Sequence, residues 1–492
     1  MKFKGLENYW FTVVLLLGLI SIYVAIMVSC LSGTLSYLNF GTLTIPSVFL
    51  FIVCVFISSV HSKYYFSILA FILLAFPSPI DDIFPSVTIS NLDDLNTVVF
   101  PIITRIDVFL IFGIILKVIK TNFKVQVLKL PLIIKLFILM WFAVFIINLL
   151  FSKDVLDFNL LLAYSYHIRY FILLLILINL YDITVYKKQL IFSLLFSVFF
   201  LLIEAYVNSN MKGLDRLSSG SLSLNTFANI SAALGVYLII LLRKGLVNRL
   251  YGFFGLGIVI VIMIASGTRG AFITMGLSYF LFYFIENPNK IFKNTIRVGL
   301  GFFAIIAVYF IMLGKGFVPE RYSYEEITKN IEIDFSKDHL NEQIKIRVTP
   351  ETTSIKSRID LFDASINMIK ENSLFGIGSG RWNRYKNKYS SNNNVPKVLL
   401  DSHNDYLALW SQYGIPLGSL FAFVIFLYPL VLFKRIKTFN NGPLSYLFVI
   451  NLTMGIAAIS NSGFFKHQVA ALLMLCVCIL LKLARNEKET IR

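Results

Sequence analysis

Long apolar runs separated by short polar gaps make up most of this chain of 492 residues. A helix that crosses the hydrocarbon core of a bilayer needs roughly 20 apolar residues, and several runs approach or exceed that length. We count about fourteen candidate spans in all. The apolar residues in these runs are continuous, which favours helices over alternating strands. The predicted spans are approximately residues 11–31, 46–60, 64–76, 98–118, 131–151, 159–180, 189–207, 227–242, 250–266, 271–285, 297–314, 415–433, 445–460 and 467–484. The second and third are short and could be tilted or re-entrant, so about twelve true crossings is the alternative.

One long polar segment divides the chain into three parts. We expect a transmembrane bundle of about eleven spans over residues 1–314, an extracytoplasmic loop with amphipathic helices over 315–414, and the last spans with a short cytoplasmic tail over 415–492. The part of the loop around 320–353 is charged and is expected to be extended. The predicted fold class is therefore an all-α polytopic membrane protein with one large outer loop.

Apolar residues recur along residues 354–371 at the spacing of one face of a helix. The stripe consists of Ile355, Ile359, Phe362, Ile366 and Ile369. Such a helix is expected to lie on the membrane or on the bundle. Arg358 beside the stripe could bind a phosphate through two parallel hydrogen bonds. A snorkelling side chain or a surface ion pair explains its position equally well.

A second loop helix is predicted over residues 403–413. Ser402 and Asp405 fit a capping box, so Ser402 is the expected N-cap, and Gly414 is expected to end the helix. His403 would then lie in the first turn, where the positive end of the helix dipole disfavours the charged imidazolium. A neutral imidazole can accept a proton from a hydroxyl group. A structural histidine that hydrogen-bonds the loop is the alternative.

Composition and charge support the membrane interpretation and predict its sidedness. Hydrophobic residues make up 57% of the chain, and the mean hydropathy is +0.77. The net charge of +17 does not indicate nucleic-acid binding, because most Lys and Arg lie in the short gaps between apolar runs. Alternation from a cytoplasmic N-terminus places these basic gaps and the C-terminus in the cytoplasm. The loop 315–414 and the turn Ser266–Gly270 then share the outer face.

Residues that commonly bind metals are scattered. The four cysteines lie in apolar runs and imply no disulfide framework, and the five histidines form no ligand pair. We therefore expect neither a metal nor another cofactor. The outer aspartates could hold a divalent cation against a pyrophosphate, although acidic residues are also what an outer loop tolerates. They are Asp81, Asp82, Asp93 and Asp94.

The glycine-rich segment from Ser373 to Trp382 resembles a nucleotide-binding loop only superficially, because it follows a predicted helix rather than a strand. A turn that lets the backbone approach a ligand or the bundle is the better interpretation. The neighbouring Arg381, Trp382 and Arg384 combine cations with an aromatic ring. That combination suits a sugar and phosphate surface, and equally an interfacial anchor.

Charged residues within predicted spans are functional candidates by default, with internal ion pairing as the alternative. They are Arg105, Asp107, Arg169 and Glu204.

Four segments, taken in order, resemble the bacterial O-antigen ligase and O-antigen polymerase superfamily (WaaL- and Wzy-like proteins). They lie within residues 216–418, a range of nearly half of the chain, and share the predicted outer face of a multispanning protein, which makes the set fairly specific. The segments are Arg216 to Ala228, with Asn225-Thr226-Phe227-Ala228; Ser266 to Ala271, with Thr268 in place of a usual serine; Arg358 to Gly380, with Ser373 where proline is common; and Ser402 to Gly418, with its His-Asn pair.

The resemblance implies a C-type glycosyltransferase (GT-C) fold in a bacterial inner membrane, with the active site on the periplasmic face. It implies a glycan donor on undecaprenyl pyrophosphate, a glycan or lipid-core acceptor, a chain-length regulator protein as a further partner, and inverting transfer without a metal. By motif, Arg269 and Arg358 would hold the pyrophosphate, and His403 would act on the acceptor hydroxyl. Further binding candidates are Arg169, Arg216, Arg381, Trp382, Arg384 and Asn404.

Several functions remain open at this point. The sequence hardly separates a polymerase of repeat units from a ligase of finished glycan; we lean slightly to polymerase because nothing marks a lipid-core docking site. A lipid-linked oligosaccharide flippase or other transporter is the alternative from another class, although it would not need the long outer loop. A metal-dependent transferase that uses the outer aspartates is the third candidate.

Overall fold

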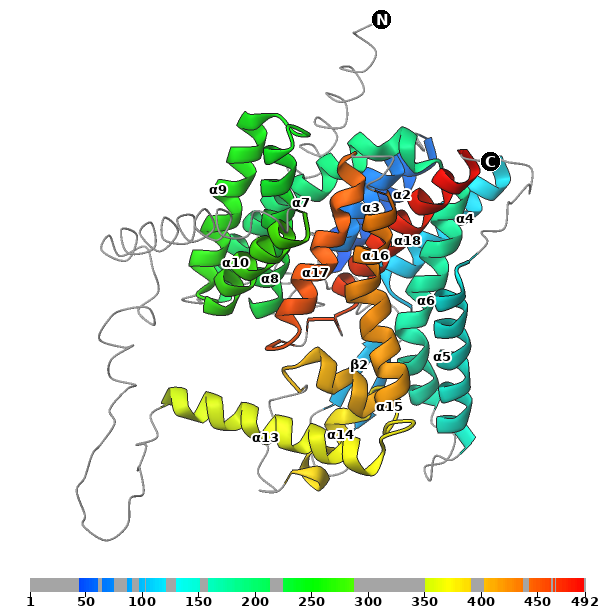
Figure 1. Ribbon diagram of the computed structural model, residues 1–492, viewed down its shortest axis with the longest axis vertical. Coiled ribbons are helices and arrows are strands. Elements are labelled where there is room, and N and C mark those ends of the chain that lie inside the picture. Colours follow the sequence, from blue (N-terminus) through cyan, green and yellow to red (C-terminus); the bar gives the residue numbers. More distant parts are fainter. Residues whose placement is uncertain are drawn as a thin grey trace, which may run out of the picture.

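The computed structural model is a helical bundle with one small sheet (Figure 1). The structure describes residues 44–60, 64–74, 86–90, 97–101, 103–120, 130–150, 158–212, 224–286, 350–390, 402–436, 442–461, 463–464 and 466–490. The predicted spans 11–31 and 297–314, residues 320–349 of the charged part of the loop and the four outer aspartates lie outside these residues, while residues 350–353 are helical rather than extended.

The described elements follow the predicted apolar runs closely. The first part of the chain forms α2 (Thr44–Val60), α3 (Tyr65–Leu74), β1 (Ser86–Ser90), β2 (Thr97–Pro101), α4 (Arg105–Lys120), α5 (Leu132–Leu150), α6 (Phe158–Leu180) and α7 (Ile183–Lys212). The second part forms α8 (Leu224–Arg243), α9 (Arg249–Ser266), α10 (Arg269–Glu286), α13 (Pro350–Glu371), α14 (Trp382–Tyr389), α15 (Asp405–Ala422), the π-helical turn η5 (Phe423–Leu427), α16 (Tyr428–Ile436), the 3₁₀ turn η6 (Pro443–Leu447), α17 (Phe448–Ala457) and α18 (His467–Thr490).

Six helical stretches among the described residues are long and apolar enough to cross a membrane, by length and composition. They are Leu132–Leu150, Val185–Ile203, Leu224–Arg243, Arg249–Ser266, Asp405–Ile436 and His467–Arg485. Five shorter apolar helices accompany them. These stretches confirm the prediction of a helical, multispanning membrane protein, while the GT-C arrangement and the full number of spans stay predictions.

The centre of the bundle is formed by α8 and α18. Helix α8 packs on α9, α10 and α17, and α18 packs on α6 and α16. The outer helices keep large apolar side chains exposed, such as Leu139 on α5 and Phe253 on α9. We expect those side chains to contact lipid, because a large exposed apolar surface is unfavourable in water.

The two ends of α8 carry different chemistry. At its C-terminal end, Arg243 and Lys244 form ion pairs with Glu286, which ends α10. At its N-terminal end, the Thr268 hydroxyl donates to Asn225 Oδ1 at 3.4 Å. A helix of 20 residues is about 30 Å long, so the basic end and the motif end are well separated. The charge pattern predicts this separation; which end faces the cytoplasm stays a prediction.

A two-stranded sheet corrects the expectation of a purely helical chain. Strands β1 and β2 pair antiparallel, with Ser86 opposite Pro101 and Ser90 opposite Thr97. The predicted span 98–118 accordingly starts too early, and its helix begins at Arg105. β-Branched residues are frequent in both strands, and such residues favour a pleated ribbon over a helix.

Helix α13 exists as predicted, but its apolar stripe does not face the protein. Ile359 is 60% exposed and Ile366 is 41% exposed, whereas Leu361 and Met368 are fully buried. The buried pair packs with Trp382 of α14 in a separate small core. Figure 1 shows α13 lying across the lower end of the bundle, close to α14 and α15. Periodicity identified a helical stripe, but it could not tell which surface the stripe meets.

Candidate functional site

His403 lies in a turn before α15, not in the first turn of the helix as predicted. The helix begins at Asp405, and its N-cap is Asn404, whose Oδ1 accepts a hydrogen bond from Leu407 N at 3.0 Å. The predicted cap, Ser402, instead bonds the backbone of Asn404. His403 has φ +51°, and it is the one non-glycine residue with positive φ in the described part of the chain. A histidine there is strained, and such strain is common at functional sites.

The residues after His403 fasten the turn to the described part of the α17–α18 turn (residues 458–461, 463 and 464). The Asp405 N–H donates to Ala458 O at 2.9 Å, and Asp405 Oδ2 accepts from Phe464 N at 2.9 Å. Asn404 Nδ2 donates to Ile459 O at 2.8 Å. Asp405 is buried, whereas His403 is partly exposed. The neighbours of His403 therefore hold the backbone, and its imidazole stays accessible.

The first and second motif segments contact each other where α9 ends and α8 begins. Gly267, with φ +66°, ends α9, and α10 begins two residues later at Arg269. Thr268 between them bonds Asn225 at the start of α8. The side chain of Arg269 and all of Arg216 lie outside what the structure describes.

The α17–α18 turn joins these segments to His403. A Cβ placed on Gly463 would lie 3.7 Å from Thr226 Cγ2 and 3.7 Å from Asn461 Nδ2. Asn461 is 6% exposed, and its Nδ2 has no hydrogen-bond partner among the residues that the structure describes. Sequence analysis missed this turn. Its signal was the polar stretch Ser460 to Gly463 between the last two predicted spans.

The third and fourth motif segments interlock through their backbones. Ile377 N donates to Ser411 O at 2.8 Å, and Ile415 N donates to Ser373 O at 2.7 Å. A Cβ on Gly414 would lie 2.2 Å from the Leu374 carbonyl oxygen, too close for any side chain. Gly414 has φ +77° and breaks the helix where the sequence predicted it to end.

The glycine-rich segment also needs a glycine, Gly376, where its backbone meets the backbone of the helix. A Cβ on Gly376 would lie 2.4 Å from the Gln412 carbonyl oxygen, and Gly376 has φ +68°. The glycine-rich segment thus approaches the bundle backbone, one of the two contacts expected of it.

Buried polar groups extend the same contact into the bundle. Ser379 Oγ lies 2.8 Å from Tyr413 OH, which lies 3.4 Å from His167 Nδ1 on α6. The His167 ring stacks on Phe464, with ring centroids 5.1 Å apart. The glycine-rich segment and the α17–α18 turn are therefore linked through one buried row of side chains.

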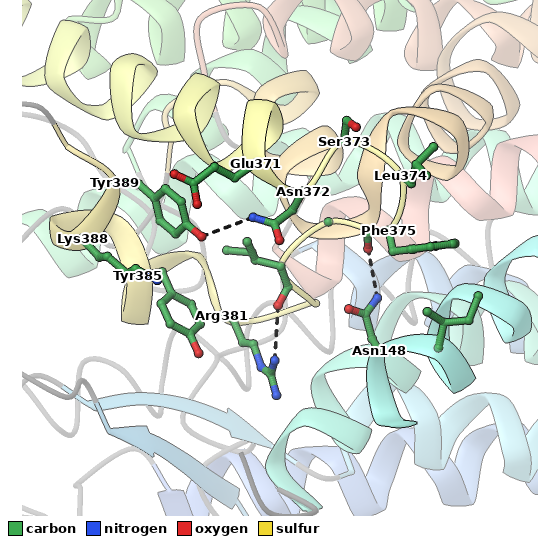
Figure 2. A pocket seen from close by; sticks show the side chains of 13 residues that line it. Asn148, Glu371, Asn372, Ser373, Leu374, Phe375, Arg381, Tyr385, Lys388 and Tyr389 are labelled. Carbon is green, nitrogen blue, oxygen red and sulfur yellow. Dashed lines mark hydrogen bonds between the residues drawn. The ribbon is translucent and has the colours of Figure 1, made fainter. Parts of the chain in front are cut away.

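A cavity of about 650 Å³ opens beside the glycine-rich segment (Figure 2). It is lined by Ile147, Asn148, Glu371, Asn372, Ser373, Leu374, Phe375, Gly376, Ile377, Arg381, Tyr385, Lys388 and Tyr389. Arg381 lines it, as a binding residue should. Trp382 does not, because it is buried and its Nε1–H donates to Ser365 Oγ at 2.9 Å. Trp382 is therefore a packing residue and not a sugar platform.

The remaining candidates are spread over the site. Arg358 is exposed on α13, and Arg384 lies over the Tyr385 ring with its guanidinium carbon 5.9 Å from the ring centroid. Asn404 has the capping and anchoring contacts described above. The structure neither brings these residues together with Arg269 nor separates them from it, since the Arg269 side chain is not described.

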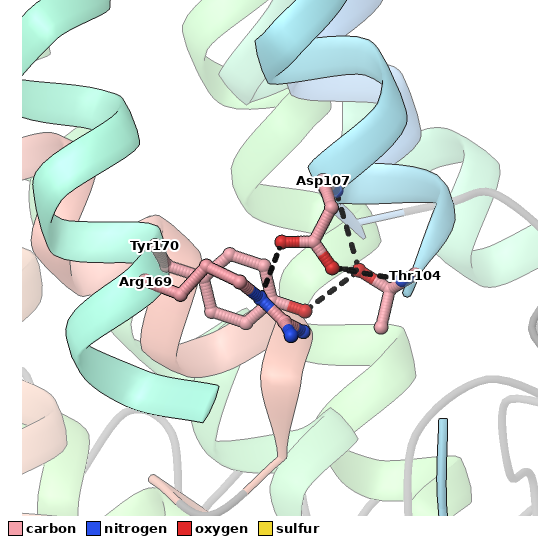
Figure 3. A network of polar contacts seen from close by, with 4 residues as sticks. All are labelled: Thr104, Asp107, Arg169 and Tyr170. Atoms are coloured by element: carbon pink, nitrogen blue, oxygen red, sulfur yellow. Dashed lines mark hydrogen bonds and ion pairs between the residues drawn. The ribbon is translucent and has the colours of Figure 1, made fainter. Parts of the chain in front are cut away.

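Arg169 forms the internal ion pair that sequence analysis gave as the alternative (Figure 3). Its Nε lies 2.8 Å from Asp107 Oδ1. Thr104 donates to Asp107 Oδ2 from its backbone N–H at 2.8 Å and from its hydroxyl at 2.9 Å, and that hydroxyl lies 2.7 Å from Tyr170 OH. The buried Asp107 carboxylate is thus balanced by a cation and two hydrogen bonds, which ties α4 to α6. The Glu204 side chain is not described.

Comparison with known proteins finds a family match over part of the chain. Residues 254–422 match the O-antigen ligase family, a range that includes three of the four segments. An uncharacterized protein of Haemophilus influenzae is 24% identical over 255 residues, which are 49% of this chain and 59% of that protein. The chain thus spans little more than half of that relative's length. The family match supports the membership of this chain in the O-antigen ligase and O-antigen polymerase superfamily.

Proposed function

We propose that this protein transfers a glycan from undecaprenyl pyrophosphate to a hydroxyl acceptor at the outer face of a bacterial inner membrane. The observation that carries the proposal is the series of contacts that connects three of the four motif segments through the α17–α18 turn. Thr268 bonds Asn225, Thr226 lies beside Gly463, and the neighbouring Phe464 bonds Asp405 next to His403. Residues that are far apart in sequence thus border one region at one end of the bundle.

The leaving group determines what the cations would do. As the bond between the sugar and the pyrophosphate breaks, negative charge develops on the phosphate oxygens. Arg269 and Arg358 would stabilise that charge, and electrostatic stabilisation of this kind is usually the largest catalytic contribution. Arg358 is exposed on α13 and so accessible to a ligand. No metal is required in this scheme, because pyrophosphate leaves readily once its charge is balanced.

His403 would assist the acceptor. The acceptor hydroxyl loses its proton as its oxygen attacks the anomeric carbon from the face opposite the pyrophosphate, which inverts that centre. A neutral imidazole can accept the proton, and such general-base assistance contributes about 10²–10⁴-fold. The accessible imidazole on a backbone that Asn404 and Asp405 hold fixed is suited to this role.

A deletion strain tests the proposal. We expect loss of the surface glycan ladder, restored by the wild-type gene but not by His403→Ala, with the variant present in membranes at wild-type level. Polymerase function predicts single repeat units in place of the ladder, and ligase function predicts long lipid-linked chains that accumulate.

Three outcomes would contradict the proposal. A wild-type ladder with His403→Ala removes the base. Accumulated lipid-linked glycan that externally added glycosidase cannot reach in spheroplasts indicates a flippase. Loss of transfer by the purified protein in EDTA indicates the metal-dependent alternative. Tyr251→Ala is a matched control, since Tyr251 is exposed on α9 near the basic end of the bundle.

A further inference from the structure

The residues that line the cavity beside the glycine-rich segment have no role in the transfer step proposed above. Tyr385, Lys388 and Tyr389 of α14 form one side, and Asn148 of α5 lies on the opposite side near Phe375 (Figure 2). Its volume of about 650 Å³ lies within the range of about 300–1,000 Å³ that is typical of small-ligand pockets.

The lining combines aromatic rings with amides and cations. Asn372 Nδ2 donates to Tyr389 OH at 3.3 Å, which fixes the tyrosine beside the cavity. Lys388 lies over the same ring, with Nζ 5.2 Å from its centroid. Asn148 Nδ2 donates to Phe375 O at 3.0 Å, which fixes the opposite wall. A pyranose ring has apolar C–H faces that pack on aromatic rings and hydroxyl groups that bond amides and cations.

The surroundings of the cavity place its ligand at the membrane surface. Two of its lining residues are apolar and exposed, Leu374 at 62% and Phe375 at 41%. Asn148 lies in the last turn of α5, an apolar helix long enough to span a membrane. The ligand would therefore be polar and held where a membrane-spanning helix ends, as the sugars of a lipid-anchored glycan are.

The cavity is also distant from His403. The glycine-rich segment binds the backbone at Ser411 and Gln412, while His403 precedes the other end of the same helical segment. At 1.5 Å per residue, those ends are roughly 12 Å apart. A sugar in the cavity is thus removed from the bond that the histidine would help to form.

We propose that this cavity is a glycan subsite, which binds pyranose units of a membrane-anchored glycan away from the reacting bond. The inference rests on the proposed function and names the part of the substrate that α14 recognises. The glycan is that of the donor or that of the acceptor, since both present the same chemistry to the two tyrosines.

Direct binding tests the subsite without relying on turnover. The full-length protein in nanodiscs is titrated with two lipid-free probes: the glycan released by mild acid from the lipid-linked pool of the deletion strain, and the acceptor glycan released from its cell surface. Tyr385→Ala and Tyr389→Ala should each raise Kd for one probe about tenfold, the loss expected for an aromatic contact. The probe that is affected identifies the source.

Matched variants separate recognition from folding. Tyr385→Phe keeps the ring and leaves the hydrogen bond between Asn372 and Tyr389 in place, so it should bind within about twofold of wild type. Tyr251→Ala should bind as wild type. If an alanine variant fails to fold, Lys388→Ala tests the same wall from an exposed position. Wild-type protein that binds neither probe, or variants with unchanged Kd, would overturn the subsite.

The binding assay also separates the subsite from the proposed function. Glycan binding that depends on the tyrosines, together with a wild-type ladder in the His403→Ala strain, would retain the subsite and refute the transferase. An inactive His403→Ala strain with unchanged Kd in the tyrosine variants would refute the subsite alone. If inorganic phosphate binds with the same Kd as the glycan, the cationic side chains alone account for binding in the cavity, and the proposal is overturned.

Discussion

The two ends of the helical segment from Asp405 to Tyr413 are fixed in different ways. At the His403 end, the side chains of Asn404 and Asp405 bond the α17–α18 turn and leave the imidazole accessible. At the other end, Gly376 and Gly414 bring two backbones so close that no side chain fits. We therefore expect one end to supply a reacting group and the other to maintain the backbone geometry, although both ends belong to one motif segment.

This difference predicts different consequences of substitution. At the His403 end, activity should fall while the protein remains folded, because Asn404 and Asp405 supply the bonds that hold the turn. At the glycine end, the stability of the fold should fall, because any added atom must displace a carbonyl group.

The largest effect is expected from His403→Asn. Asparagine tolerates positive φ better than most residues, so this change removes the imidazole with little added strain. Transfer by the purified protein should fall about 10²–10⁴-fold, the usual contribution of a general base, with the thermal midpoint unchanged. A variant that transfers at the wild-type rate would show that the turn is structural.

Gly414→Ala should destabilise the protein by about 3 kcal/mol, from positive φ and overlap with the Leu374 carbonyl. Thermal unfolding in detergent, followed by size-exclusion chromatography, measures the loss. Gly257→Ala on α9 is the matched control, because a Cβ there meets nothing within 4 Å. Equal stability of the two variants would contradict the interlocked backbones.

The smallest effect is expected from Asp405→Ala. It removes the carboxylate that accepts a hydrogen bond from the Phe464 N–H, which costs about 1–3 kcal/mol. Displacement of His403 should lower kcat about tenfold, as a small misplacement of a catalytic group can. Asp405→Asn keeps an acceptor oxygen and should recover most of both losses. An Asp405→Ala variant that loses stability but keeps kcat would show that the clamp does not position the histidine.

The sequence was sufficient to predict where most of the helices lie and that the helical segment from Asp405 ends at Gly414. Continuous apolar runs located α5, α8, α9 and α10 to within a few residues, because membrane-crossing length constrains them. Gly414 was recognised as a break because glycine is the residue that positive φ favours.

Long-range contacts explain what sequence analysis missed. Ser402 and Asp405 fit a capping box, but Asp405 bonds Phe464 instead, and Asn404 becomes the cap. The partner of Arg169 could not be assigned, because Asp107 lies on another helix. The exposed side of α13 could not be predicted either, because a helical stripe gives no information about what it faces.

The central claim is that the four motif segments surround one prenyl-diphosphate site. A structure of the full-length protein in nanodiscs with undecaprenyl pyrophosphate tests it most directly. We predict the diphosphate in contact with Arg269 and Arg358 and on the same side of the bundle as His403. A diphosphate bound at the opposite end, beside Arg243 and Lys244, would contradict it.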